Sequence, residues 1–265
     1  MFLQGHSELE RDDTGPFRVY RDDQGRIYHS VTHILKNTTD SDALERWKER
    51  MGERAGTISR VATTRGTRAH GRVEWRLKTA RKLAINAANA RGVRRISPGI
   101  WKWALARAYK SKPPKLDFSC AGYGRCLDEW VEQNCAGEAA VELKVTAVAE
   151  EGVGSGIAGW AGTFDAALFL KDRPGLWLVD WKTSATRRGG EMVWDYFDQL
   201  GAYRAGVLQH NPGVVFEGGA VVIARRAGPP DVHWLTGLEL ERRSESFAER
   251  FRRYCATGGE CGMGL

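Results

Sequence analysis

The chain has 265 residues, 42% of them hydrophobic and ten of them tryptophan, which is enough to bury a sizeable core and excludes disorder as the default state. No stretch approaches the roughly 18 apolar residues that a membrane helix needs. Acidic side chains among residues 8–13 exclude an ordinary signal or transit peptide. The composition therefore predicts a cytoplasmic protein of the phage or bacterial type that makes no membrane contact, and we expect a monomer.

Positive charge is concentrated in one part of the chain. The net charge is +7, but between Arg54 and Lys115 there are seventeen Lys or Arg residues and a single acidic residue, Glu74. This block carries +16, and the rest of the chain, at 7 − 16, carries −9. The aromatic residues within it are Trp75, Trp101, Trp103 and Tyr109. The pattern favours binding of a polyanion through its phosphates with bases stacked on the rings; a solvated helix face without a ligand is the alternative.

The first half of the chain reads as a hairpin followed by helices. Alternating apolar residues over 17–28, with a turn at Asp22-Asp23-Gln24-Gly25, predict the hairpin. A helix capped by Asp40 or Ser41 should run to residue 51, a second over 57–84, and a third over 98–109 before Pro113-Pro114. Gly66 and Gly71 are weak points of the second helix.

The second half alternates strands and helices. After a short helix over 127–134, strands are predicted at 140–148, 157–170 and 176–181, then a helix over 192–209. Strands at 219–225 and 232–238 and a helix over 241–254 follow, and the residues after Thr257 should form a frayed tail. The fold class is therefore α/β, more closely α+β with a mixed sheet.

Asp180-Trp181-Lys182 closes an apolar run, and residues two apart on a strand point to the same face of a sheet. A carboxylate and an ammonium group thus converge at a strand end, although any salt-bridged strand could carry this pattern. Upstream, Asp165 lies within an apolar, aromatic strand, where a lone carboxylate is costly and a metal shared with Asp180 would explain it. Gln199 and Tyr203 are four apart and share a helix face.

These motifs together resemble the signature of RecB-like nucleases of the PD-(D/E)XK superfamily. The matching segments are Gly-Thr-Phe-Asp165, Val-Asp180-Trp-Lys182-Thr-Ser and Gln199-x-x-x-Tyr203, and Arg65-Gly-Thr-Arg-Ala-His70 is similar to the R-G-T-x-x-H motif of these enzymes. Residues 30–35 also resemble the segment that opens the mitochondrial genome maintenance exonucleases and their phage relatives. The resemblance spans about residues 27–206. It implies a restriction-endonuclease-like core over 136–265 and an N-terminal hairpin with a basic helical extension over 1–135, packed as one compact unit.

The resemblance also implies a catalytic centre. Asp165, Asp180, the backbone carbonyl of Trp181 and His70 would hold Mg²⁺ or Mn²⁺. Lys182 would activate water or neutralise the transition state, and Gln199 and Tyr203 would position Lys182 or the substrate. Taken alone, His70 reads as an ordinary core or surface histidine. The residues expected at the DNA are Arg65, Arg68, Arg72, Trp75, Arg76, Thr183 and Ser184.

The roles of Glu142 and of the cysteines are considered separately, because neither belongs to the motifs above. Glu142 occupies the place of the acidic residue in the first core strand of these nucleases, where it lines the site or pairs with a neighbouring lysine. The cysteines are Cys120, Cys126, Cys135, Cys255 and Cys261, an odd number without a C-x-x-C pair, so reduced thiols and no iron–sulfur cluster are expected.

The function expected from these residues is a metal-dependent DNA exonuclease that prefers single strands with a free end. A structure-specific or restriction-like endonuclease could use the same core. An accessory DNA-binding protein of recombination or packaging is a second alternative, and loss of a metal ligand would indicate it.

Overall fold

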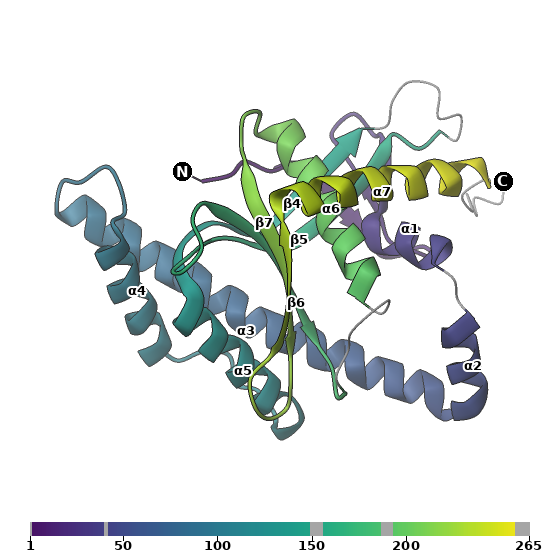
Figure 1. Ribbon diagram of the computed structural model, residues 1–265, viewed down its shortest axis with the longest axis horizontal. Helices are drawn as coiled ribbons and strands as arrows, with labels where there is room; N and C mark the ends of the chain where they lie inside the picture. Colours follow the sequence, from purple (N-terminus) through teal and green to yellow (C-terminus); the bar gives the residue numbers. More distant parts are fainter. Residues whose placement is uncertain (1, 40–41, 149–155, 187–192, 258–265) are drawn as a thin grey trace.

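The computed structural model describes residues 2–39, 42–148, 156–186 and 193–257. These residues form one mixed sheet of eight strands with helices on both faces (Figure 1). The strand order is β1-β2-β3-β5-β6-β7-β8, and β4 pairs with β5 outside this path. The mixed α/β class predicted from the sequence is confirmed. None of the helices in these ranges is long and apolar enough to cross a membrane.

The strands are β1 (Glu10–Asp12), β2 (Val19–Arg21), β3 (Ile27–Ser30), β4 (Cys135–Val148), β5 (Gly159–Leu170), β6 (Leu176–Thr183), β7 (Phe216–Ala224) and β8 (Asp231–Thr236). The helices are α1 (Val31–Thr38), α2 (Asp42–Met51), α3 (Arg54–Ala90), α4 (Pro98–Lys110), α5 (Phe118–Asn134), α6 (Trp194–His210) and α7 (Gly237–Ala256). The predicted hairpin is β2 and β3, paired antiparallel. The expected caps of α2, Asp40 and Ser41, and the tail after residue 257 lie outside the described residues.

Four elements differ from the prediction, and one of them is α1, for which no helix was predicted. β1, which extends the hairpin by one strand, was not predicted, and α3 is a single 37-residue helix that continues through both glycines. α5 begins at Phe118 and not at residue 127, because the side chain of Asp117 caps it by accepting a hydrogen bond from the Cys120 N–H at 3.1 Å. Gly122 and Gly124 disfavour this helix in the sequence, but close packing requires them: a Cβ at Gly122 would lie 2.1 Å from the backbone oxygen of Arg226.

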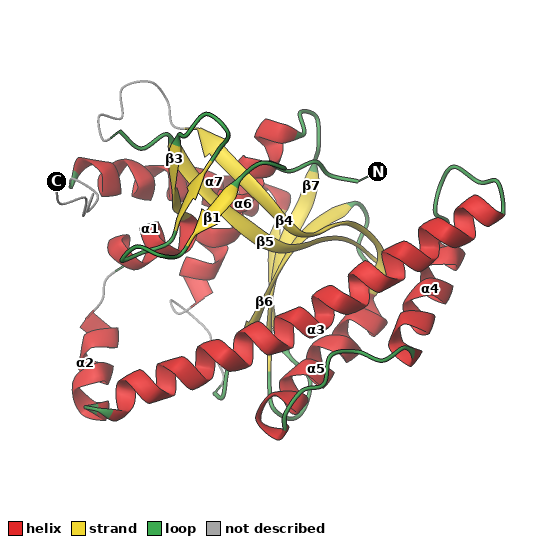
Figure 2. Ribbon diagram, turned by 180° about the vertical axis from the view of Figure 1, so that it is seen from behind, coloured by secondary structure: helices red, strands yellow, loops and turns green. Residues whose placement is uncertain are grey.

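Two buried clusters lie on opposite faces of the sheet. α3, α4 and α5 cover one face, and α1, α6 and α7 cover the other (Figures 1 and 2). The face of α3 that packs inward carries small and branched residues one helical turn apart, among them Ala69, Val73, Leu77, Ala80 and Ala84, all fully buried. This stripe holds α3 against α4 and α5 and keeps the helix continuous across the sheet.

The sheet forks at β5. β4 lies along one edge of β5 for nearly its whole length. On the other edge, β3 pairs in parallel with residues 159–161, and β6 pairs antiparallel with residues 166–169. No pairing among the described residues joins 162–165 to β3 or β6. The backbone of β5 is therefore open between the two partner strands, and this opening contains Asp165.

Candidate active site

Asp165 is held at the fork by the neighbouring strand. The β5–β6 ladder ends where Ala166 pairs with Val179, and Asp165 and Asp180 are the next residues on the two strands. Oδ2 of Asp165 accepts a hydrogen bond from the Trp181 N–H at 2.6 Å, so a side-chain oxygen replaces the backbone acceptor of the ladder. The Asp165 side chain is only 13% exposed. The two aspartates are thus opposed on neighbouring strands, at the point where these strands separate.

A chain of polar contacts runs from β6 into α6. Lys182 Nζ lies 2.5 Å from Oδ2 of Asp180 and donates a hydrogen bond to Oε1 of Gln199 at 3.0 Å. Nε2 of Gln199 in turn donates to the Tyr203 hydroxyl at 2.8 Å. The ammonium group also lies 5.0 Å from the centre of the Tyr196 ring. The structure therefore brings together the four residues that the sequence singled out on these two elements.

α3 brings His70 to the fork from the opposite face of the sheet. Its Nδ1 lies 3.5 Å from Oδ1 of Asp165, and its side chain is 23% exposed. A histidine from the basic helix and an aspartate almost one hundred residues later therefore face each other.

Glu142 lies on β4, opposite Asp165 of the neighbouring strand β5. Its neighbours Val141 and Leu143 pair with residues 166 and 164 of β5. The backbone φ of Glu142 is +50°, in the left-handed region that a glutamate rarely adopts. Lys144, the lysine next to it on the strand, donates instead to the backbone oxygen of Leu9 at 2.8 Å. This arrangement favours the interpretation in which Glu142 lines the site.

Three carboxyl groups and two basic groups, Lys182 and His70, meet at the fork. Burial raises the pKa of Asp180 to about 6 against the opposing effect of Lys182, and the charge of Asp165 raises it further. Burial also raises the pKa of Glu142 to about 8, and Asp165 adds to this shift. At Asp165 burial acts in the same direction, but His70, Lys182 and the Trp181 N–H outweigh it, so the pKa of this carboxyl is lowered. A cation would stabilise the ionised forms of all three groups.

The donor set at the fork suits a hard divalent cation. Three carboxylates, one imidazole nitrogen and the carbonyl of Trp181 are the ligand types that Mg²⁺ and Mn²⁺ take. Oδ2 of Asp180 is buried and makes no hydrogen bond of acceptable geometry within the described chain, although Lys182 Nζ lies beside it. Lys182 therefore occupies the position next to this carboxylate that a cation would take.

A tighter group of potential metal ligands lies at the β2–β3 turn. In the described ranges, the set of three potential ligand atoms that all lie within 4.8 Å of one another belongs to His6, Asp22 and Asp23. Oδ1 of Asp22 already accepts the N–H groups of Gln24 and Arg26, and Oδ2 accepts the Arg26 guanidinium and the Tyr28 hydroxyl. Its lone pairs are used by the turn, so this group has a structural explanation without a metal.

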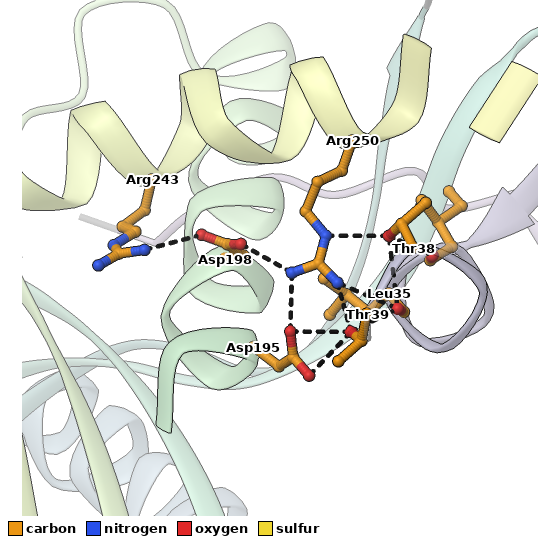
Figure 3. Close-up of polar contacts among 8 residues, drawn as sticks. Leu35, Thr38, Thr39, Asp195, Asp198, Arg243 and Arg250 are labelled. Atoms are coloured by element: carbon orange, nitrogen blue, oxygen red, sulfur yellow. Dashed lines mark hydrogen bonds and ion pairs between the residues drawn. The ribbon is translucent and has the colours of Figure 1, made fainter. Parts of the chain in front are cut away.

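Arg250 on α7 anchors the beginning of α6, which carries Gln199 and Tyr203. The guanidinium donates to Asp195 at 2.7 Å and to Asp198 at 2.9 Å, both on α6. It also donates to Thr38 at 2.9 Å, to the backbone oxygen of Leu35 at 3.1 Å, and to Thr39 (Figure 3). Arg243 reaches the other oxygen of Asp198 at 3.4 Å. Three helices are thereby joined by one buried side chain.

The arginines expected at the DNA lie in two different environments. Arg65 is half-buried, donates to the Thr183 hydroxyl at 3.4 Å and lies 4.7 Å from the centre of the Tyr123 ring. Arg68 is exposed and contacts Asp117. Arg72 pairs with Asp128 at 2.5 Å and has a side chain 20% exposed.

Arg76 lies inside the helical layer. It is 2% exposed, donates to the backbone oxygen of Asp128 at 2.6 Å and stacks on the Tyr109 ring at 4.4 Å. Its placement on the DNA surface is therefore corrected: it joins α3 to α4 and α5. Ser184 is also buried, with its N–H bonded to the Ala224 oxygen, whereas Trp75 is half-buried.

Sequence reasoning missed Arg250 and the two aspartates that it contacts. Their partners lie more than fifty residues away, so no local spacing indicated them. Among the described cysteines, Cys120, Cys126 and Cys135 are buried free thiols and Cys255 is half-buried, whereas Cys261 lies outside the described residues.

No family model and no curated protein matches this chain. A solved structure with some likeness to it is a protein from Eubacterium rectale that bears the name "Putative exonuclease", with 16% sequence identity and a TM-score of 0.37. The match covers 61% of this chain, and this chain spans 64% of the length of that protein. A likeness at this level establishes neither a shared fold nor a shared activity, so the residues at the sheet fork have to carry the functional assignment.

Proposed function

We propose that the chain is a metal-dependent deoxyribonuclease with a RecB-like PD-(D/E)XK core over residues 136–265 and a DNA-binding helical extension before it. The observation that carries this proposal is the convergence of Asp165, Asp180 and Lys182 at the opening in the sheet, with His70 facing them from the basic helix α3. Phosphodiester hydrolysis needs an activated water and stabilisation of the charge that develops on the phosphate.

Asp165, Asp180, the Trp181 carbonyl and His70 would hold Mg²⁺ or Mn²⁺, with Glu142 as an additional carboxylate. The cation supplies an acidified water and neutralises phosphate charge. Binding requires Lys182 to leave Oδ2 of Asp180, and its hydrogen bond with Gln199 offers the alternative position. Gln199 and Tyr203 would then hold the ammonium group beside the phosphate.

Lys182 is best suited to a role as a cation. While Lys182 lies beside Asp180, burial acts to lower its pKa, but Asp180 and Asp165 outweigh burial and raise it, so the amine is protonated near neutral pH. A protonated lysine orients water or neutralises the developing negative charge. We therefore favour charge stabilisation over proton abstraction for this residue.

Single-stranded DNA with a free end is the proposed substrate. α3 is part of the +16 block and brings His70 directly to the fork, so a strand that follows the basic helix leads to the carboxylates. A flexible single strand would follow the helix into the fork more readily than a rigid duplex. An endonuclease would use the same residues, and only its tolerance of closed circles would differ.

The experiment is digestion of end-labelled linear and covalently closed single-stranded DNA with Mg²⁺, Mn²⁺ or EDTA. We expect linear DNA to be shortened from an end only with metal, and circles to persist. Asp180→Asn and Lys182→Ala should lower cleavage by about three orders of magnitude or more without loss of fold. Asp172→Asn is the matched control and should retain full activity, because Asp172 is an exposed aspartate in the turn between β5 and β6.

The outcomes separate the alternatives. Rapid nicking of circles would reject end dependence and indicate an endonuclease. Metal-independent binding of DNA without any cleavage would indicate an accessory protein. Activity of Asp180→Asn above about a tenth of wild type would contradict the catalytic assignment itself.

A further inference from the structure

Phe118 is the most exposed of the large hydrophobic residues in the described ranges, at 84%. It is the first residue of α5. The side chain of Asp117 already caps this helix, so helix formation does not require an aromatic residue at position 118. A single exposed apolar residue is common on protein surfaces. Its significance here depends on the side chains around it.

Arg226 lies over the Phe118 ring. Its guanidinium carbon is 5.1 Å from the ring centre, and the arginine is exposed in the turn between β7 and β8. The described residues offer it no carboxylate within ion-pair distance, whereas the adjacent Arg225 pairs with Asp231 at 3.7 Å. The backbone contact at Gly122 holds this turn against α5. An aromatic face and a cation without an acidic partner are therefore kept together on the surface.

This pair lies at the same end of the sheet as the candidate active site. β6 and β7 run in parallel, with Lys182 opposite Ile223 and Thr183 opposite Ala224. Arg226 is three residues beyond Ile223, or about 10 Å along the strand direction. Figure 1 shows the β7–β8 turn and the beginning of α5 together at this end.

A second arginine–aromatic pair connects the two places. Arg65 of α3 donates to the Thr183 hydroxyl at 3.4 Å, and its guanidinium lies 4.7 Å from the centre of the Tyr123 ring on α5. A carboxylate near Phe118, that of Asp117, is already paired with Arg68. Tyr123 itself is buried, so the surface from Thr183 to Phe118 presents the positive charge of Arg65 and Arg226 and the exposed aromatic face of Phe118.

We propose that Phe118 and Arg226 form a stacking platform for an unpaired base of single-stranded DNA, with Arg226 and Arg65 contacting the flanking phosphates. This inference rests on the proposed function and assigns the position of the strand next to the cleaved bond. A phenyl face stacks on any base, and the arginines match the charge of the backbone. The platform thus binds without sequence preference and discriminates unpaired from paired bases.

The test measures binding of a fluorescent single-stranded oligonucleotide in EDTA, so that cleavage does not interfere. Phe118→Ala should raise the Kd about 5- to 150-fold, the equivalent of about 1–3 kcal/mol for one stacked base. Phe118→Tyr should restore binding, because the aromatic face is kept. Because Phe118 is so exposed, the melting temperature should not change in either variant.

The chain supplies a matched control. Phe2 is 45% exposed and lies under Arg81, with the guanidinium carbon 4.8 Å from its ring centre. The N-terminus lies toward the other end of the sheet in Figure 1. Phe2→Ala should leave DNA binding unchanged.

A 2-aminopurine base in the bound oligonucleotide adds a direct readout: its fluorescence should be quenched by wild type and Phe118→Tyr and recover with Phe118→Ala. If the wild type cleaves DNA and Phe118→Ala binds it as tightly as the wild type does, the platform is wrong but the proposed function stands. The same titration is repeated with a duplex of the same sequence, and an equal loss of single-stranded and duplex binding in Phe118→Ala would overturn base stacking. If the wild type neither binds nor cleaves DNA, the platform and the proposed function are both wrong.

Discussion

Replacement of Arg250 should destabilise the protein more than any surface arginine. Arg250→Met keeps much of the aliphatic volume but removes the guanidinium, which is bonded to two aspartates, two threonines and a backbone oxygen. Asp198 would suffer most, because its side chain is only 5% exposed and it retains just the 3.4 Å contact with Arg243. Asp195, at 37%, is hydrated more easily.

Breaking a buried ion pair from one side costs about 3–5 kcal/mol. Asp198 keeps one contact and Asp195 is partly exposed, so the loss of unfolding free energy in Arg250→Met should lie near the lower end of this range, at about 3 kcal/mol. With a slope of about 3 kcal/mol per molar urea, the unfolding midpoint should fall by about 1 M. Urea unfolding followed by circular dichroism measures this shift.

Two further variants test the reasoning. Arg252→Met on the same helix is the control, because Arg252 is exposed, and it should change the midpoint little. Adding Asp198→Asn to Arg250→Met should recover part of the loss, since the uncompensated buried charge disappears. A loss below about 1 kcal/mol in Arg250→Met, or strictly additive effects in the double variant, would refute the assignment of the buried charge as the cause.

Three other predictions follow from the site and its surroundings. His70→Ala should raise the metal concentration for half-maximal cleavage about tenfold; an unchanged metal titration would make His70 structural. Gly162→Ala should place a Cβ 2.6 Å from Cε1 of Tyr203, destabilise the fold by about 1–3 kcal/mol and slow cleavage, and unchanged urea midpoints and rates would contradict this. His29 is buried, and burial together with the charge of His33 lowers its pKa to about 4. His29 therefore stays neutral in the folded state, whereas it is protonated below about pH 6.5 in the unfolded state. Its contribution to the free energy of unfolding is present above pH 6.5 and is lost as the pH falls toward 4; at pH 5 the loss is about 2 kcal/mol. His29→Gln should flatten the difference between urea midpoints at pH 7.5 and 5, and an equal difference in the variant would exclude His29 as its source.

The elements that carry the candidate site were predictable because each has a local signal. Asp165 stands out as a carboxylate in an apolar strand, and Asp180 and Lys182 share a face because strand side chains alternate. Gln199 and Tyr203 share a helix face for the corresponding reason in a helix. Local spacing thus determined which side chains could act together within one element.

The relation between elements was decided only in the tertiary structure. Arg76 has the same basic pattern around it as Arg65, yet one is buried between helices and the other reaches Thr183 at the sheet fork. Hydrophobic periodicity identifies the face of a helix that packs inward but not the neighbour it will meet.

The fork itself shows the same division. The sequence alone determined that β5 and β6 are strands with their acidic residues in place, because period-two patterning is local. That β3 and β6 share one edge of β5 and leave residues 162–165 open depends on the pairing of β5 with β3, which lies more than one hundred residues earlier in the chain. Such contacts are selected by the packing of the whole chain, and the charge balance of Asp165, Asp180 and Glu142 arises only once that packing has removed them from water.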